Sequence, residues 1–116
     1  MTDQDCLFCK ILAGDIPADR VYEDEKVFAF ADISPQAPFH ALIIPREHIA
    51  TLNDLDDAHG PLMGQLFLAA KTIAAREGFQ EGGYRTIVNC NAGAGQTVFH
   101  IHLHLLAGRP LGWPPG

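Results

Sequence analysis

The chain has 116 residues, a length that supports one hydrophobic core and is too short for two, so we expect a single domain over residues 1–116. Hydrophobic residues make up 47% of the sequence and charged residues 19%, a balance that predicts a packed interior and excludes long disorder. The formal net charge of −6 offers no basic surface to a nucleic acid, although a single phosphate needs only a few N–H donors.

The first half of the chain predicts a short helix followed by three strands. Apolar residues recur at helical spacing over residues 6–14, where a glycine ends the pattern. Residues 21–23 and 27–31 are two apolar runs around a polar turn, which indicates a hairpin. Residues 40–44 resume the strand pattern and end at Pro45, because proline lacks the N–H donor that a strand interior needs.

The second half predicts one long helix and two more strands. Residues 57–77 place their apolar side chains on one stripe, and a glycine follows as a stop. Residues 84–89 and 98–107 have strand patterns, separated by the glycine-containing loop 90–97. Helices and strands therefore mix without a regular alternation, which predicts an α+β fold with an antiparallel sheet.

No targeting signal is recognisable in the sequence. The start, Met1 to Asp5, lacks the basic and apolar regions of a secretory signal, and no apolar run reaches the ~18 residues of a membrane-spanning helix. The cysteines Cys6, Cys9 and Cys90 are an odd number. We therefore expect a cytoplasmic protein with reduced thiols, no structural disulfide and no membrane partner.

Three histidines alternate with aliphatic residues in the last predicted strand, in the order His100-Ile101-His102-Leu103-His104. Because strand side chains alternate between faces, we expect all three imidazoles on one face, ~6.8 Å apart, with the aliphatic residues in the core. A polar strand face with incidental histidines and a three-histidine metal site are the plainer alternatives. We favour phosphorus chemistry, since neutral imidazole is a nucleophile and protonated imidazole a donor.

The loop directly before these histidines is suited to a phosphate. Gly93 and Gly95 let the backbone approach a ligand closely, while Gln96 and Thr97 carry side-chain donors. It is not a P-loop, because the glycine-rich lysine motif of that loop is absent. Its position beside the histidines makes it a candidate phosphate site.

The histidine pattern resembles the motif of the histidine triad (HIT) superfamily, and the chain is similar to bacterial members of its histidine triad nucleotide-binding (Hint) branch. Supporting segments are Phe8-Cys9-Lys10-Ile11, Asp32 to Pro38, Ile44 to Ile49, Gly95 to Val98 and Trp113-Pro114-Pro115-Gly116. The resemblance implies the HIT fold, with an antiparallel sheet of about five strands, one long helix and one short helix. It also implies a two-fold homodimer.

For function, the resemblance implies a purine nucleoside phosphoramidase. Such an enzyme hydrolyses adenosine 5′-phosphoramidate or aminoacyl-adenylate substrates to AMP and an amine, through a nucleotidyl-histidine intermediate and without a cofactor in the chemistry. Two alternatives stay open, a dinucleoside polyphosphate hydrolase and a non-catalytic nucleotide-binding regulatory dimer. Thr97 points toward the first alternative, because most members of the branch have Ser there.

Carried over by position, the resemblance assigns His102 as the nucleophile, surrounded by His40, His100 and His104. Asp32 matches the residue that binds the ribose hydroxyls. The implied apolar base pocket consists of Phe8, Ile11, Phe30, Ile33 and Leu42. The implied phosphate contacts are Asn89, Gly95, Gln96 and Thr97, together with His102 and His104. Plainer explanations are ordinary core packing for the apolar residues and a turn for Asp32.

The expected chemistry makes two demands on the histidines. The nucleophile His102 needs a free lone pair on one ring nitrogen, so its other nitrogen should donate to a nearby backbone carbonyl. Protonated His104, with donors from Gln96 and Thr97, would stabilise the charge on the phosphoryl group and help the leaving group.

The spacing Cys6-x-x-Cys9 is half of a zinc site, and the sequence has no second cysteine pair. Similarity to bacterial members of the family and to the related galactose-1-phosphate uridylyltransferases implies that His48 and His100 complete a tetrahedral site for a structural zinc ion. The alternative is that both cysteines are small buried thiols at the start of a helix.

Overall fold

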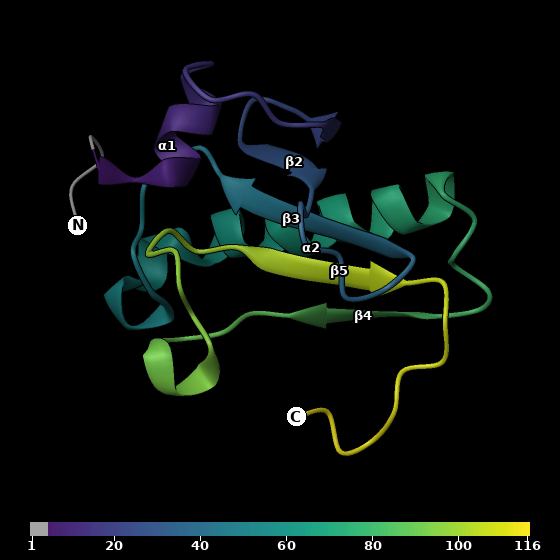
Figure 1. Cartoon of the computed structure of the whole chain (residues 1–116). Coiled ribbons are helices and arrows are strands. Elements are labelled where there is room, and N and C mark those ends of the chain that lie inside the picture. The colour runs from purple at the N-terminus through teal and green to yellow at the C-terminus, as the bar shows by residue number, and fades with distance from the viewer. Residues whose placement is uncertain (1–4) are drawn as a thin grey trace.

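A five-stranded antiparallel sheet is the frame of the computed structural model, which describes residues 5–116 (Figure 1). Its strands are β1 (Arg20–Glu23), β2 (Val27–Ala31), β3 (Phe39–Pro45), β4 (Tyr84–Ile87) and β5 (Leu103–Ala107). They lie in the order β1-β2-β3-β5-β4, so β3 is central and β4 forms one edge. The predicted α+β class, the antiparallel sheet and its five strands are confirmed.

Two helices cover opposite faces of this sheet (Figure 1). The short helix α1 (Leu7–Leu12) begins where the Cys6 side chain accepts a hydrogen bond from the Cys9 amide, and it leads into Gly14 at a φ of 82°. The long helix α2 spans Gly60–Arg76. Within residues 5–116, no helix is both long and apolar enough to cross a membrane. Residues 1–4, part of the segment without a secretory signal, lie outside the described residues.

Helix α2 begins three residues later than the sequence pattern predicts. Residues Asp57–His59 form a separate 3-10 turn, capped by the side chain of Asp56. The helix then starts at Gly60, which places Pro61 in the first turn. Proline is tolerated there because the first N–H groups of a helix have no partner within the helix.

Alternation along β3 divides the interior into two clusters. Ala41 and Ile43 pack with the buried face of α2, whereas Leu42 and Ile44 pack with Phe8 of α1. Burying a side chain the size of Leu or Ile stabilises the folded state by about 1.5–3 kcal/mol. A shift of one residue would exchange the two faces of the strand, so this pattern strongly fixes its register. The α1 side of the sheet is consequently the face that receives His40, which shares the parity of Leu42.

The last strand is shorter than predicted. It begins at Leu103 rather than at residue 98, so His100 and His102 precede it and only His104 lies on the strand. The neighbouring strand β3 ends at Pro45, which has no N–H, and the Pro45 carbonyl accepts a hydrogen bond from the His100 ring. Strand β4 likewise ends at residue 87 rather than 89.

The predicted inward face of this segment is nevertheless confirmed. Ile101, Leu103 and Leu105 are all buried in the cluster under α2, as their alternation requires. The regular ladder stops at Leu103, but the burial pattern continues for one more aliphatic residue on the N-terminal side.

Candidate functional site

Histidines from separate segments gather on the α1 side in two adjoining groups. The first, called the histidine cluster below, comprises His40, His102 and His104 with Asp32 beside them. The second, called the thiol–imidazole cluster, comprises Cys6, Cys9, His48 and His100. The three histidines of the sequence motif are thus divided between the groups, because the segment is not a regular strand before residue 103.

His102 is held in one tautomer. Its Nδ1 lies 2.8 Å from the backbone carbonyl oxygen of His100. A carbonyl can only accept, so Nδ1 carries the proton and Nε2 keeps its lone pair. The edge-on ring of Phe8 packs against the imidazole, at a centroid distance of 5.0 Å. The predicted hydrogen bond to a nearby carbonyl is therefore present, and His102 has the form that a nucleophile requires.

The tautomers of His40 and His104 follow from one backbone amide. The N–H of Gln36 donates to Nδ1 of His40 at 3.0 Å, so the proton of this imidazole is on Nε2. That Nε2 lies 2.9 Å from Nδ1 of His104 and donates to it. The proton of His104 is consequently on Nε2. Neutral His40 and His104 thus form a directed chain that begins at a backbone N–H.

Burial keeps these imidazoles neutral. It lowers the pKa of His102 and of His40 below 6.5, although the nearby Asp32 carboxylate opposes the shift in both. The pKa of His104 is lowered to about 4, first by burial and then by the repulsion that His102 and His40 would exert once protonated in acid. His104 is therefore neutral near pH 7 without a ligand, and its protonation during the reaction stays a prediction. A bound phosphate anion would raise this pKa, because an opposite charge favours the protonated form.

The Asp32 carboxylate makes two contacts. One carboxylate oxygen accepts the amide of Ser34 at 2.8 Å, which is the turn predicted as its plainer role. The other lies 3.4 Å from Nε2 of His40. Asp32 therefore both shapes the loop after β2 and adds negative charge to the histidine cluster.

Several hydrogen-bond donors of the loop of residues 90–97 already have acceptors within the protein. The Gln96 side chain is buried, donates to the carbonyls of Ala50 and Val98, and accepts from the Asn91 amide. Both N–H groups of the Gln96 side chain are thus occupied in this conformation, and its donation to a phosphate stays a prediction. Among residues 5–116, the structure shows no side-chain hydrogen bond for Asn89 or Thr97, which remain the candidate donors.

Gly95 is required in this loop for its conformation. Its φ is 97°, which favours glycine, and a Cβ there would lie 3.9 Å from the side-chain nitrogen of Asn89. The glycine thus turns the chain beside one of the two remaining donors.

The apolar residues of the implied base pocket do not all meet. Phe8, Phe30 and Leu42 are buried together beneath α1, with Ile11 packed against them. Ile33 is 98% exposed, so the expected contact of Ile33 with this group is not formed. The turn at Asp32 sends the following side chain into solvent instead.

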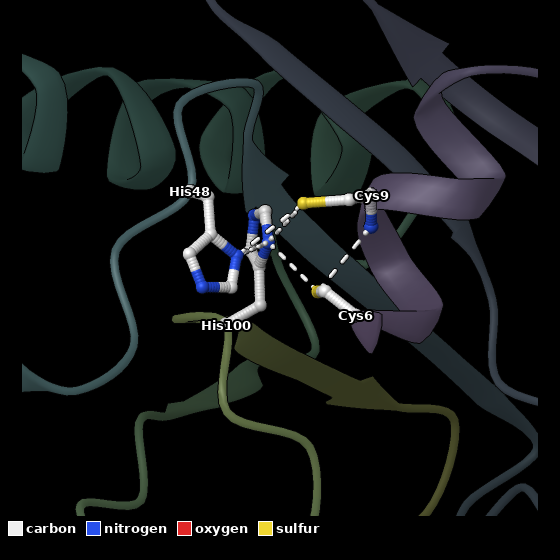
Figure 2. Close-up of side chains that lie close together, drawn as sticks. All are labelled: Cys6, Cys9, His48 and His100. Atoms are coloured by element: carbon white, nitrogen blue, oxygen red, sulfur yellow. Dashed lines mark hydrogen bonds between the residues drawn. The ribbon is translucent and has the colours of Figure 1, made fainter. Parts of the chain in front are cut away.

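The thiol–imidazole cluster has the geometry of a metal site (Figure 2). Nδ1 of His100 is 3.4 Å from the sulfur of Cys6 and 3.6 Å from that of Cys9. His48 Nδ1 lies 3.3 Å from the Cys9 sulfur and 3.2 Å from His100 Nδ1. With zinc–sulfur and zinc–nitrogen bonds of about 2.3 and 2.05 Å, tetrahedral edges are about 3.6 Å for S···N and 3.4 Å for N···N. The donor atoms therefore fit a tetrahedral zinc ion.

Sequence reasoning missed two residues that act through their backbones. The amide of Gln36 sets the tautomer of His40, and the Pro45 carbonyl accepts from Nε2 of His100 at 2.8 Å. Every residue has a backbone carbonyl, and every residue except proline has a backbone N–H. No pattern of side chains could therefore have identified these two residues.

Several known proteins are similar to this chain over nearly its whole length. A purine nucleoside phosphoramidase of Escherichia coli is 51% identical over 109 residues, covering 94% of this chain and 92% of the relative. A 14 kDa zinc-binding protein of Zea mays is 45% identical, covering 100% of this chain and 91% of that protein. A HIT family hydrolase from Legionella pneumophila has a TM-score of 0.95 at 55% identity, covering 97% of this chain and 100% of that one.

A model of the HIT domain matches residues 13–111. The chain therefore belongs to the HIT-domain family, as the resemblance of its histidine motif predicts.

The lowered pKa of His104 predicts a loss of stability in acid. The unfolded chain binds a proton at this residue below pH 6.5, whereas the folded protein binds it only below about pH 4. The stability that the protein gains from neutral His104 is therefore complete above pH 6.5 and is lost as the pH falls toward 4. Urea unfolding should show a shallower loss over this range for His104→Gln than for the unsubstituted protein. Equal slopes in this range would contradict the assignment, and equal slopes above about pH 7 are the internal control.

Proposed function

We propose that this HIT-domain protein, acting as one domain over residues 1–116, is a purine nucleoside phosphoramidase. Its substrates would be adenosine 5′-phosphoramidate and aminoacyl-adenylate types, and its products AMP and an amine. The observation that carries the proposal is the hydrogen bond from His102 Nδ1 to the His100 carbonyl, which leaves the Nε2 lone pair available for attack. The phosphoramidase of Escherichia coli, 51% identical, supports this choice of substrate.

In the first step, Nε2 of His102 attacks the α-phosphorus, the P–N bond breaks, and its electron pair leaves on the amine nitrogen. An anionic phosphate beside His40 and His104 raises their affinity for a proton, so the substrate complex carries one there. The departing nitrogen takes this proton. In the second step, water attacks phosphorus, AMP leaves His102, and the proton of the water returns to the His40–His104 pair.

Binding would use the residues that surround this pair. Asp32 would accept hydrogen bonds from the ribose hydroxyls, and the donors of Asn89 and Thr97 would hold the phosphate. The base would pack near Ile11, and Ile33 would close over it from the exposed turn. Gln96 would act indirectly by fixing the shape of the loop.

Replacing the nucleophile tests the proposal directly. In His102→Ala, turnover of adenosine phosphoramidate should fall by roughly 10³ or more, because the covalent route is lost. The dissociation constant of AMP should stay within about threefold, since the other binding groups remain. In the unsubstituted protein, rapid quenching should trap a nucleoside monophosphate on His102.

The matched control is His59→Ala, which removes a histidine outside both clusters. Near-normal turnover of His102→Ala, or a label on another residue, would refute the mechanism. Diadenosine tetraphosphate, assayed in parallel, tests the alternative of a dinucleoside polyphosphate hydrolase. Absence of turnover of either substrate would favour a regulatory nucleotide-binding protein.

We further propose that Cys6, Cys9, His48 and His100 hold a structural zinc ion, which would cross-link the segments that carry them. The fit of the donor distances supports this, as does the relative in maize that is named for zinc binding. A cytoplasmic location, as the sequence predicts, would keep both thiols reduced and able to bind metal. The zinc ion would not contact the reacting atoms.

Elemental analysis of protein purified without chelator should therefore find about one zinc per chain. Cys6→Ser/Cys9→Ser should remove it, because two of the four ligands are lost. Cys90→Ser, which changes a thiol outside the cluster, should retain the metal. A metal-free protein whose thermal stability does not change in the double variant would show that these cysteines only pack.

We also propose a two-fold homodimer formed through the edge strand β4 and the adjacent surface of α2. Phe67 and Leu68 on α2 are each 54% exposed, and Leu68 lines a surface hollow together with Tyr84 of β4. An open strand edge beside exposed apolar side chains is self-complementary across a two-fold axis. Trp113, 83% exposed, lies on a tail held by hydrogen bonds from Arg85 to the carbonyls of residues 111 and 112.

Sedimentation of the intact protein should therefore show a dimer. Leu68→Glu should shift it toward monomer, because the change places a charge in the apolar contact. Leu52→Glu is the control, since Leu52 is exposed on a different segment. A monomeric intact protein, or a dimer that Leu68→Glu leaves intact, would refute this interface.

A further inference from the structure

We infer that the thiol–imidazole cluster positions the nucleophile, so that its integrity controls turnover as well as stability. The inference rests on the proposed role of His102. His100 makes the connection, because its ring belongs to the thiol–imidazole cluster and its carbonyl accepts the hydrogen bond that selects the His102 tautomer. His100 is therefore a positioning residue rather than a catalytic one.

The ring of His100 is held at both nitrogens. Nε2 donates to the Pro45 carbonyl at 2.8 Å, and Nδ1 faces the sulfur of Cys6 at 3.4 Å. The side chain is fully buried. Because β5 begins only at Leu103, the backbone at His100 has no strand ladder to hold it. Its ring contacts therefore supply much of the order that a strand would otherwise provide.

The peptide unit that follows His100 is tied to the same segment as the cluster. Its carbonyl accepts from Nδ1 of His102, and its N–H, which belongs to Ile101, donates to the carbonyl of Ile49 at 2.8 Å. Ile49 directly follows His48, whose Nδ1 lies 3.2 Å from that of His100. The cluster thus joins the two segments whose relative position orients this carbonyl.

A second connection runs through α1. Phe8 lies between Cys6 and Cys9 in the sequence, and its ring packs edge-on against both His100 and His102. With only six residues, α1 is too short to be stable without tertiary contacts. Figure 2 shows both cysteines at the start of α1, facing His48 and His100. The cysteines therefore anchor the helical turn that carries Phe8.

Disrupting the cluster therefore has a specific consequence. Once the segments around His48 and His100 can separate, the hydrogen bond that His102 Nδ1 donates to the His100 carbonyl weakens, and the imidazole distributes between its two tautomers. Only the tautomer with the proton on Nδ1 has a lone pair on Nε2 for attack. Most of the loss of turnover should appear in kcat, because only Ile11 of the proposed binding groups lies on α1, whereas Asp32, Asn89 and Thr97 lie on other segments.

The test compares Cys6→Ser/Cys9→Ser with two controls. Cys90→Ser changes a thiol outside the cluster, and Ile73→Ala destabilises the α2 core without touching either cluster. Imidazole nitrogen NMR reports the His102 tautomer without any substrate, and steady-state kinetics with adenosine phosphoramidate gives kcat and KM.

In the double variant, kcat should fall at least about tenfold, with KM within about twofold, and His102 should show mixed tautomers. Both controls should keep the single Nδ1–H tautomer. Wild-type protein stripped by a chelator should reproduce the mixture, and adding zinc back should reverse it. This second route applies even if the double variant does not fold.

An unchanged His102 tautomer in the metal-stripped protein would overturn the inference. So would an equal loss of kcat in Ile73→Ala, because general destabilisation would then explain the effect. The tautomer measurement needs no turnover, so it separates this inference from the proposed function. A tautomer shift in a protein without phosphoramidase activity would support the coupling and refute the activity. An active protein whose His102 tautomer does not change would refute only the coupling.

Discussion

The hydrogen bond from His102 to the His100 carbonyl is the constraint on which the site depends. A carbonyl cannot donate, so this contact alone decides which nitrogen of His102 bears the proton and which can react. The carbonyl is oriented by its neighbours, through the amide of Ile101 and the ring of His100. The tautomer of the central histidine is therefore a property of the packing between the segment after β3 and the segment before β5.

Burial keeps the histidines reactive, but it also lowers the stability of the fold unless each buried ring nitrogen has a hydrogen-bond partner. A buried imidazole is kept neutral, which preserves the lone pair of His102, yet a buried ring nitrogen without a partner would destabilise the fold. The structure provides backbone partners, including the Gln36 amide for His40 and the Pro45 carbonyl for His100. Since backbone groups are already fixed by the fold, they orient the rings without the entropy loss of further long side chains.

The alternation of β3 separates stability from chemistry. Ala41 and Ile43 complete the core under α2, while His40 and Leu42 face the side of α1, where both clusters lie. Residues on the α1 face can therefore change without disturbing the continuous apolar core on the α2 face. The thiol–imidazole cluster adds the anchoring that the short helix α1 cannot obtain from its own length.

The sequence by itself determined the features that depend on local period and residue type. Alternation fixed the inward face of Ile101 and Leu103, and the spacing of the two cysteines indicated a half-site for metal. The family resemblance of the motif already grouped His100 with those cysteines. Tertiary structure alone decided that the Gln96 amide donates to the carbonyls of Ala50 and Val98, and that His104 is neutral without a ligand. The physical reason is that side-chain direction follows from the local backbone, whereas hydrogen-bond partners and desolvation depend on which distant segments meet.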